Sequence, residues 1–177
     1  ERGLAERFWC EQLPVSPRAA IALAEAEIDR ARAEGLTPTV VGSSLGGYYA
    51  TWLAERHGLR AVLVNPAVVA PLSLEVFVGT QTNLDTGESF DFTHGHIDEL
   101  RALEVPAITH PERYWLLAET GDEVLDYRHA VAKYAGARQT VLQGGDHGFS
   151  RWGDYLDAVI AFAQAGAPAG AGTGTTS

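Results

Sequence analysis

The chain is almost free of sulfur, with one cysteine, Cys10, and no methionine among its 177 residues. A single cysteine excludes an internal disulfide, so we expect a reducing, cytoplasmic setting. Long apolar runs are also missing. The longest, residues 61–72, is interrupted by Asn65, Pro66 and Pro71, which makes it too short and too broken to cross a bilayer. We therefore expect no membrane span.

Basic residues are scarce, since 13 Lys and Arg stand against 23 Asp and Glu, for a net charge of −10. This balance argues against binding to nucleic acid or to anionic membrane surfaces. The apolar share of 46% suits one globular domain, which we place at residues 1–164. Residues 165–177 are rich in Gly, Ala and Thr and are expected to be a disordered tail. Residues 1–6 resemble the end of a helix, so we expect that an N-terminal strand and loop are missing.

Strand and helix patterns alternate along the chain. Strands are predicted at residues 7–13, 37–41, 61–64, 114–118 and 139–142, and helices at 17–34, 48–57, 122–135 and 152–163. The strands are apolar without polar alternation, which is typical of a parallel sheet covered on both faces. The sequence thus predicts an α/β fold. The long segment 67–113 between two core strands is a candidate lid over the site.

The most informative motif is Gly-x-Ser-x-Gly, from Gly42 to Gly46, between a predicted strand and a predicted helix. In that context the motif forms a nucleophile elbow, a tight turn that exposes the central serine above the sheet and needs glycines on either side. Ser44 is the predicted nucleophile, and the backbone N–H of Leu45 is a predicted oxyanion donor. Ser43 is expected to position the turn.

A serine nucleophile needs a base and an acid, which follow it along the chain in the order acid, then histidine. Asp122 and His147 each follow a predicted strand, within glycine-containing loops, and so should reach the same sheet edge as Ser44. Asp122 could instead cap the helix predicted from residue 122, and Asp126 and Glu123 are lesser candidates for the acid.

Other residues carry weaker signals. The pair His94 and His96 lacks a third ligand, so no metal is expected. Within the candidate lid, four apolar residues are equally consistent with an acyl pocket and with lid core: Leu72, Leu74, Val76 and Phe77.

The chain resembles the YqiA-type esterases, small bacterial α/β-hydrolases, over about residues 4–162. The matching segments are residues 42–53, 64–68, 115–117, 120–128 and 144–149. The resemblance implies an α/β-hydrolase fold and a cofactor-free esterase or thioesterase, and it carries the catalytic roles onto Ser44, Asp122 and His147. Members of the family begin with a strand and a Leu-His-Gly-Phe-type loop. No His-Gly pair precedes residue 42 here, so the second oxyanion donor is unassigned.

These patterns predict a serine hydrolase of small acyl esters or thioesters that works through an acyl-enzyme on Ser44. Two alternatives share the same residues. One is an acyltransferase or perhydrolase, which differs only in the acceptor of the acyl group. The other is a catalytically silent binding protein built on the hydrolase fold. Acyl chain length and oligomeric state do not follow from the sequence.

Overall fold

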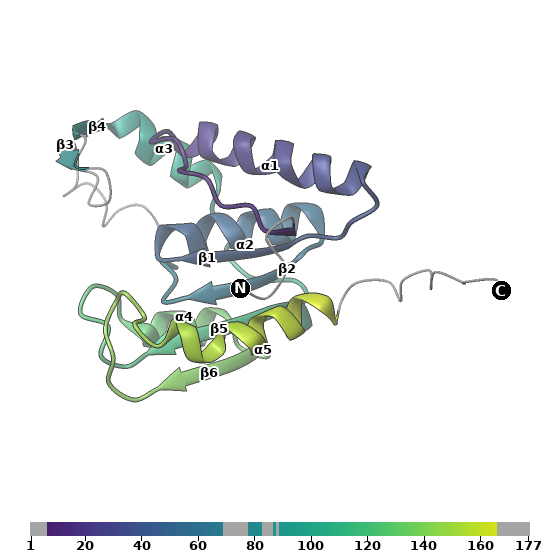
Figure 1. Ribbon diagram of the computed structural model, residues 1–177. Coiled ribbons are helices and arrows are strands. Elements are labelled where there is room, and N and C mark those ends of the chain that lie inside the picture. Colours follow the sequence, from purple (N-terminus) through teal and green to yellow (C-terminus); the bar gives the residue numbers. More distant parts are fainter. Residues whose placement is uncertain (1–6, 69–77, 83–86, 88, 166–177) are drawn as a thin grey trace.

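A four-stranded parallel sheet forms the centre of the molecule, in the order β1-β2-β5-β6 (Figure 1). The computed structural model describes residues 7–68, 78–82, 87 and 89–165. The strands are β1 (Thr39–Ser43), β2 (Arg60–Val64), β5 (Tyr114–Glu119) and β6 (Arg138–Leu142). Because every pair is parallel, all four strands end at the same edge of the sheet. This edge carries the candidate site.

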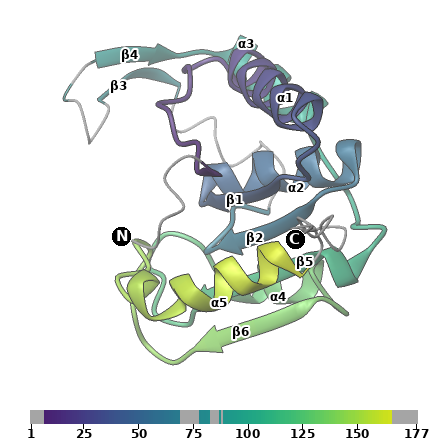
Figure 2. The ribbon, with the colours of Figure 1, turned by 45° about the vertical axis from the view of Figure 1, so that its right-hand side comes forward.

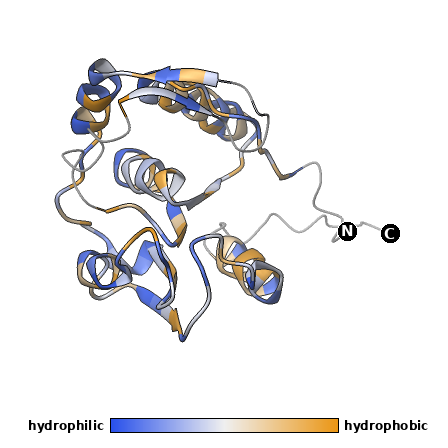
Figure 3. Cartoon of the chain, turned by 90° about the vertical axis from the view of Figure 1, so that its left-hand side faces the viewer, coloured by the Kyte–Doolittle hydropathy of each residue, from blue (hydrophilic) through white to orange (hydrophobic). Residues whose placement is uncertain are grey.

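Helices cover both faces of the sheet. On one face, Leu63 and Leu116 pack with α2 (Leu45–His57) and α4 (Tyr127–Lys133). On the other, Val62, Trp115 and Leu117 pack against α5 (Trp152–Gln164). In Figure 3, α5 lies on one side of the strands, and α2 and α4 lie on the other. Since successive residues of each strand face two apolar layers, the strands show no polar alternation. The predicted α/β fold is confirmed.

A further layer lies outside α2, formed by α1 (Pro17–Ala33) and α3 (His94–Ala102) (Figure 2). The α1 helix begins as expected for its sequence, because the Ser16 side chain accepts from the backbone N–H of Ala19 and proline follows at the first helical position. Ile21 of α1 and Leu100 of α3 join one apolar cluster with residues of α2.

The candidate lid segment has structure of its own. It contains a hairpin of β3 (Gly79–Thr82) and β4 (Ser89–Phe92), then α3, then a short 3-10 helix at Pro111–Arg113. Part of the segment is core, because Ile97 and Leu100 are 1% exposed. Its role as a lid stays a prediction. The four apolar residues at positions 72, 74, 76 and 77 lie outside the described residues, as do residues 1–6 and 166–177.

Two predicted elements are wrong. The strand predicted at residues 7–13 does not form, and Phe8 is 72% exposed, because no neighbouring strand in the described part of the chain offers hydrogen bonds to this segment. The helix predicted over 122–135 is shorter and begins at Tyr127. The Asp122 carboxylate instead binds the backbone N–H groups of Val124 and Leu125, which turns the chain before the helix begins. Among the described residues, no helix is both long and apolar enough to span a membrane.

Candidate active site

Ser44 occupies a strained turn between β1 and α2. Its φ of 51° and ψ of −121° are unusual for a residue with a side chain. The turn is close-packed: a Cβ on Gly42 would lie 2.0 Å from the Gly46 carbonyl oxygen, and one on Gly47 would lie 2.5 Å from the Pro66 Cβ. A Cβ on Gly46 would meet nothing within 4 Å. The crowding predicted on both sides of the serine therefore falls on Gly42 and Gly47 rather than on Gly46.

His147 lies between Ser44 and Asp122, as the sequence predicts. Its Nε2 is 3.0 Å from the Ser44 Oγ, and its Nδ1 is 2.9 Å from each carboxylate oxygen of Asp122. The Asp122 side chain is 1% exposed, whereas the His147 side chain is 21% exposed. The acid is thus shielded from water, while the imidazole remains accessible at the surface of the site. Ser44 and His147 are 103 positions apart in the sequence, and the parallel sheet brings them to one edge.

The hydrogen bonds determine which ring nitrogen of His147 carries the proton. An ionised carboxylate only accepts hydrogen bonds, and Asp122 Oδ1 already accepts from two backbone N–H groups. The proton therefore sits on Nδ1 and is donated to Asp122. Nε2 is left as the acceptor for the Ser44 hydroxyl, which is the arrangement a general base requires. On the other side of the imidazole, Ser44 stands at the N-cap of α2 without capping it, so its hydroxyl is available to His147.

The two alternative acids have other partners. Glu123 accepts a hydrogen bond from the backbone N–H of His147, not from its ring. Asp126 caps α4 and forms three side-chain hydrogen bonds with Arg128, which hold the pKa of Asp126 at about 2. The geometry thus places Asp122, and neither alternative, against the imidazole.

Leu45 is the first residue of α2, so its backbone N–H has no acceptor within the helix. It follows Ser44 directly and points from the positive end of the helix dipole, which suits an oxyanion. This geometry agrees with the predicted donor role, which stays a prediction. The second donor remains unassigned.

Asn65, which with Pro66 closes the strand after the elbow helix, has a hydrogen-bonding role that the sequence did not predict. It lies directly after β2 at φ 38°, is 3% exposed, and donates from Nδ2 to the carbonyl oxygens of Asp146 and His147. Its Oδ1 accepts from the backbone N–H of Glu119. One side chain thus connects β2 to the end of β5 and to residues 143–148, the loop that carries His147. We call this segment the histidine loop. The sequence pattern that could have indicated this role is an asparagine directly after a buried strand. Asparagine adopts the left-handed conformation more often than most other residues do.

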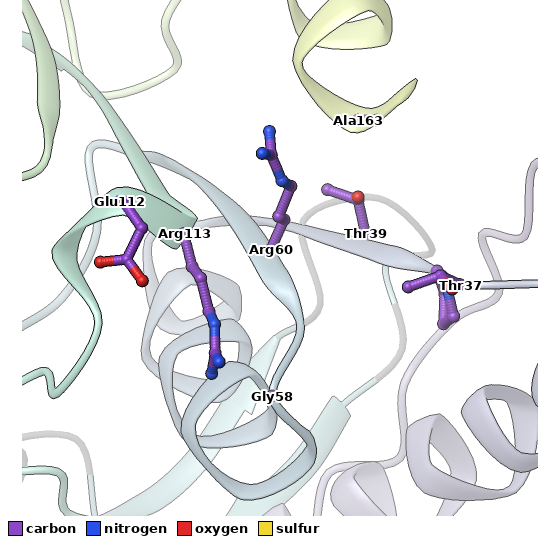
Figure 4. Close-up of a pocket in the computed structure, with 8 residues that line it drawn as sticks. Thr37, Thr39, Gly58, Arg60, Glu112, Arg113 and Ala163 are labelled. Atoms are coloured by element: carbon purple, nitrogen blue, oxygen red, sulfur yellow. The ribbon is translucent and has the colours of Figure 1, made fainter. Parts of the chain in front are cut away.

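Two cavities in the described part of the molecule lie away from these residues. One, of about 290 Å³, opens at the amino ends of β1 and β2, where Arg60 and Arg113 point in different directions (Figure 4). The other, of about 320 Å³, lies between α1, α2 and α3 and is lined in part by Ile21 and Trp52. Neither cavity is lined by Ser44 or His147, so the candidate site is marked by its hydrogen-bond geometry and not by a cavity.

The predicted absence of a metal site concerns His94 and His96. The His96 ring takes part in a capping box at the start of α3, where its Nδ1 accepts from the backbone N–H of Thr93. No three His, Cys, Asp or Glu side chains of the described residues group together as metal ligands would.

The sheet order, the strained turn and the serine–histidine–aspartate contacts define a protein with the α/β-hydrolase fold. Residues 2–164 match the family described as "Uncharacterised protein family (UPF0227)", and the chain belongs to this family. The match confirms the YqiA-type resemblance of the sequence.

Solved structures agree on the fold. A protein from Agrobacterium vitis S4 aligns with a TM-score of 0.66 at 22% identity, over 84% of this chain and 69% of that one. Est1E from Butyrivibrio proteoclasticus aligns with a TM-score of 0.62 at 15% identity, over 84% of this chain and 69% of Est1E. The mouse α/β hydrolase domain-containing protein 10 aligns with a TM-score of 0.59 at 18% identity, over 82% of this chain and 70% of the mouse protein. At these identities the likeness concerns the fold alone.

Proposed function

We propose that the protein hydrolyses carboxylic esters or thioesters through an acyl-enzyme on Ser44. One observation carries the proposal: an unbroken hydrogen-bonded path from the Ser44 Oγ through the His147 ring to the Asp122 carboxylate, with separations of 3.0 and 2.9 Å. A serine hydroxyl is a weak nucleophile, and this arrangement supplies the base that activates it.

In the proposed reaction, Ser44 Oγ attacks the acyl carbonyl carbon while His147 Nε2 takes the hydroxyl proton. Asp122 stabilises the resulting imidazolium, and the Leu45 N–H donates to the oxyanion. Collapse of the tetrahedral intermediate breaks the bond to the alcohol or thiol, which leaves with the proton from Nε2. Water then attacks the acyl-enzyme with His147 again as base, the acid is released, and Ser44 regains its proton.

We propose a small-molecule acyl substrate, no bound cofactor and a cytoplasmic location, the last because Cys10 is exposed and unpaired. The structural neighbours suggest the first substrates to test. Est1E from Butyrivibrio proteoclasticus has been solved with ferulic acid bound, and a monoacylglycerol lipase from Paleococcus ferrophilus aligns with a TM-score of 0.56 at 16% identity. A panel of p-nitrophenyl esters of increasing chain length, a feruloyl ester and an acyl thioester therefore covers the proposed range.

The decisive test is covalent labelling by a fluorophosphonate, read as intact mass. The wild type should gain one adduct and Ser44→Ala none. The adjacent Ser43, which is exposed and outside the hydrogen-bonded path, offers a matched control, and Ser43→Ala should label like the wild type. A wild type that is folded but takes no label would refute an activated Ser44 and favour the silent binding protein. A label that survives in Ser44→Ala but not in Ser43→Ala would refute the choice of serine.

A further inference from the structure

Glu119 is a buried charged residue that the proposed reaction does not use. It is the last residue of β5, its side chain has no exposed surface, and it lies three positions before Asp122. Burial of a carboxylate is unfavourable unless other groups compensate for its lost hydration. The contacts of Glu119 therefore indicate what this residue does.

Both carboxylate oxygens of Glu119 face groups that belong to the histidine loop or follow it. Oε2 accepts from the backbone N–H of Asp146 at 2.8 Å, one residue before His147. Oε1 lies 2.9 Å from Nε of Arg151, with no hydrogen bond from any described residue, so charge attraction holds this pair. Arg151 in turn donates from Nη2 to the Gln143 carbonyl oxygen. The carboxylate thus binds the loop at Asp146, and the guanidinium binds it at Gln143.

The loop backbone closes directly over the carboxylate. Gly145 has a φ of +81°, and a Cβ at this position would lie 2.1 Å from the Glu119 carboxylate carbon. A Cβ on Gly121, in the turn that leads to Asp122, would lie 2.5 Å from the Gly145 carbonyl oxygen. The turn bearing the acid and the loop bearing the base therefore pack against each other with no side chain between them.

Asn65 holds the same loop through a second set of hydrogen bonds. It binds the Glu119 backbone N–H through Oδ1 and the Asp146 and His147 carbonyl oxygens through Nδ2. Asp146, the residue before His147, is therefore held at its backbone N–H by Glu119 and at its carbonyl oxygen by Asn65. A displacement of this backbone moves the imidazole relative to Ser44 and Asp122.

We propose that Glu119 is a positioning residue for His147: its buried carboxylate fixes the histidine loop so that the imidazole reaches Ser44 and Asp122 together. The inference rests on the proposed function, since it assigns to Glu119 a role in that reaction. This role also explains why the buried end of β5 carries the charged side chain of Glu119. Misplacement of a catalytic group by about 1 Å reduces turnover by about 100-fold, so the effect should appear in kcat.

Glu119→Gln is the sharpest variant because both partners of the carboxylate are donors. An amide has one oxygen and one NH2 group, so its NH2 must face either the Asp146 N–H or Arg151, and the loop has to shift. We expect kcat for a p-nitrophenyl ester to fall about 10- to 100-fold with KM within twofold. We also expect the NMR resonance of the His147 Nδ1 proton to move or broaden. Wild-type values of both would overturn the proposal.

Glu55→Gln is the matched control. The Glu55 carboxylate also accepts a loop N–H, that of Thr109, together with the hydroxyl groups of Thr109 and Tyr114, but none of these touches the histidine loop. This variant should lose stability without changing kcat or the His147 resonance. If its kcat falls as in Glu119→Gln, the effect reflects general destabilisation and the positioning role is refuted.

Two further outcomes are distinguished. If Glu119→Gln does not fold, Arg151→Gln replaces it, because Arg151 is 37% exposed and its loss should lower kcat in the same direction. An unchanged kcat and His147 resonance in that variant would overturn the proposal. If the wild type hydrolyses no ester, the proposed function fails, and the His147 resonance alone decides whether Glu119 positions the ring.

Discussion

Replacing Asn65 by alanine should be among the most destabilising changes outside the apolar core. The substitution removes the acceptor of the Glu119 N–H, and because Glu119 is fully buried, water does not replace it. A buried donor without a partner costs about 1–3 kcal/mol. The two hydrogen bonds from Nδ2 to the histidine loop contribute about 0.5–1.5 kcal/mol each, less where water reaches the freed carbonyls.

The backbone adds a further contribution. Asn65 has a φ of 38°, and a left-handed conformation costs alanine about 1 kcal/mol more than a residue that tolerates it. Together these effects amount to about 3–7 kcal/mol, which for a chain of this size corresponds to a decrease in Tm of about 6–28 °C. Urea and thermal unfolding monitored by circular dichroism measure both quantities.

Asn65→Gly separates the two causes. Glycine accepts the positive φ but loses the same three hydrogen bonds, so it should remain well below the wild type in stability. Its larger unfolded-state entropy offsets part of the backbone gain, so it should be equal to alanine or slightly more stable. If both variants unfold within 1 kcal/mol of the wild type, the three hydrogen bonds do not stabilise the loop and the reasoning is wrong.

Three other predictions test the site and its surroundings. Asp122→Asn should lower kcat by orders of magnitude, because an asparagine no longer holds the imidazole in the required tautomer. Asp126→Asn should keep a kcat near that of the wild type. Ester kinetics measure both variants, and a loss in Asp126→Asn instead of Asp122→Asn would show that the wrong acid was chosen. Gly42→Ala should abolish folding or labelling, since its Cβ would lie 2.0 Å from a backbone oxygen, whereas Gly46→Ala should express and label normally. Burial raises the pKa of Glu55, but its hydrogen bonds to Thr109 and Tyr114 lower the pKa by a larger amount. The net pKa therefore lies below the ordinary value of 4.5. The stabilisation is therefore present above 4.5 and is lost as pH falls through the folded-state value, so Glu55→Gln should flatten the decrease in Tm below pH 4.5, and an unchanged slope would contradict this assignment.

Local patterns were sufficient for most of the helices and strands. Ser16 and Pro17 predict the start of α1, and the apolar strands predict a sheet covered on both faces, because propensity, capping and periodicity act within a few residues. The same reasoning failed over residues 7–13 and 122–126. In the first segment strand formation depends on a neighbour, and in the second a carboxylate competes with the helix for backbone N–H groups.

The proximity of Ser44, Asp122 and His147 was predictable for a related reason. A nucleophile elbow, an acid and a histidine each follow a strand, and parallel strands bring their carboxyl ends to one edge whatever their separation in the sequence. Convergence of Ser44, Asp122 and His147 therefore follows from topology. The choice among Asp122, Glu123 and Asp126 does not, because they lie within five positions of one another, and only the geometry decides which carboxylate reaches the ring.

The sequence by itself determined the α/β class, the position of the sharp turn at Ser44 and the order of the three candidate catalytic residues, all of which depend on short-range patterns. The tertiary structure decided which glycines are crowded, which acid faces His147, and that Asn65 and Glu119 hold the histidine loop. The contacts that Asn65, Asp122 and Glu119 make with the histidine loop join residues 25 to 82 positions apart. No local pattern encodes such contacts, because they exist only after β2, β5 and the histidine loop have packed together.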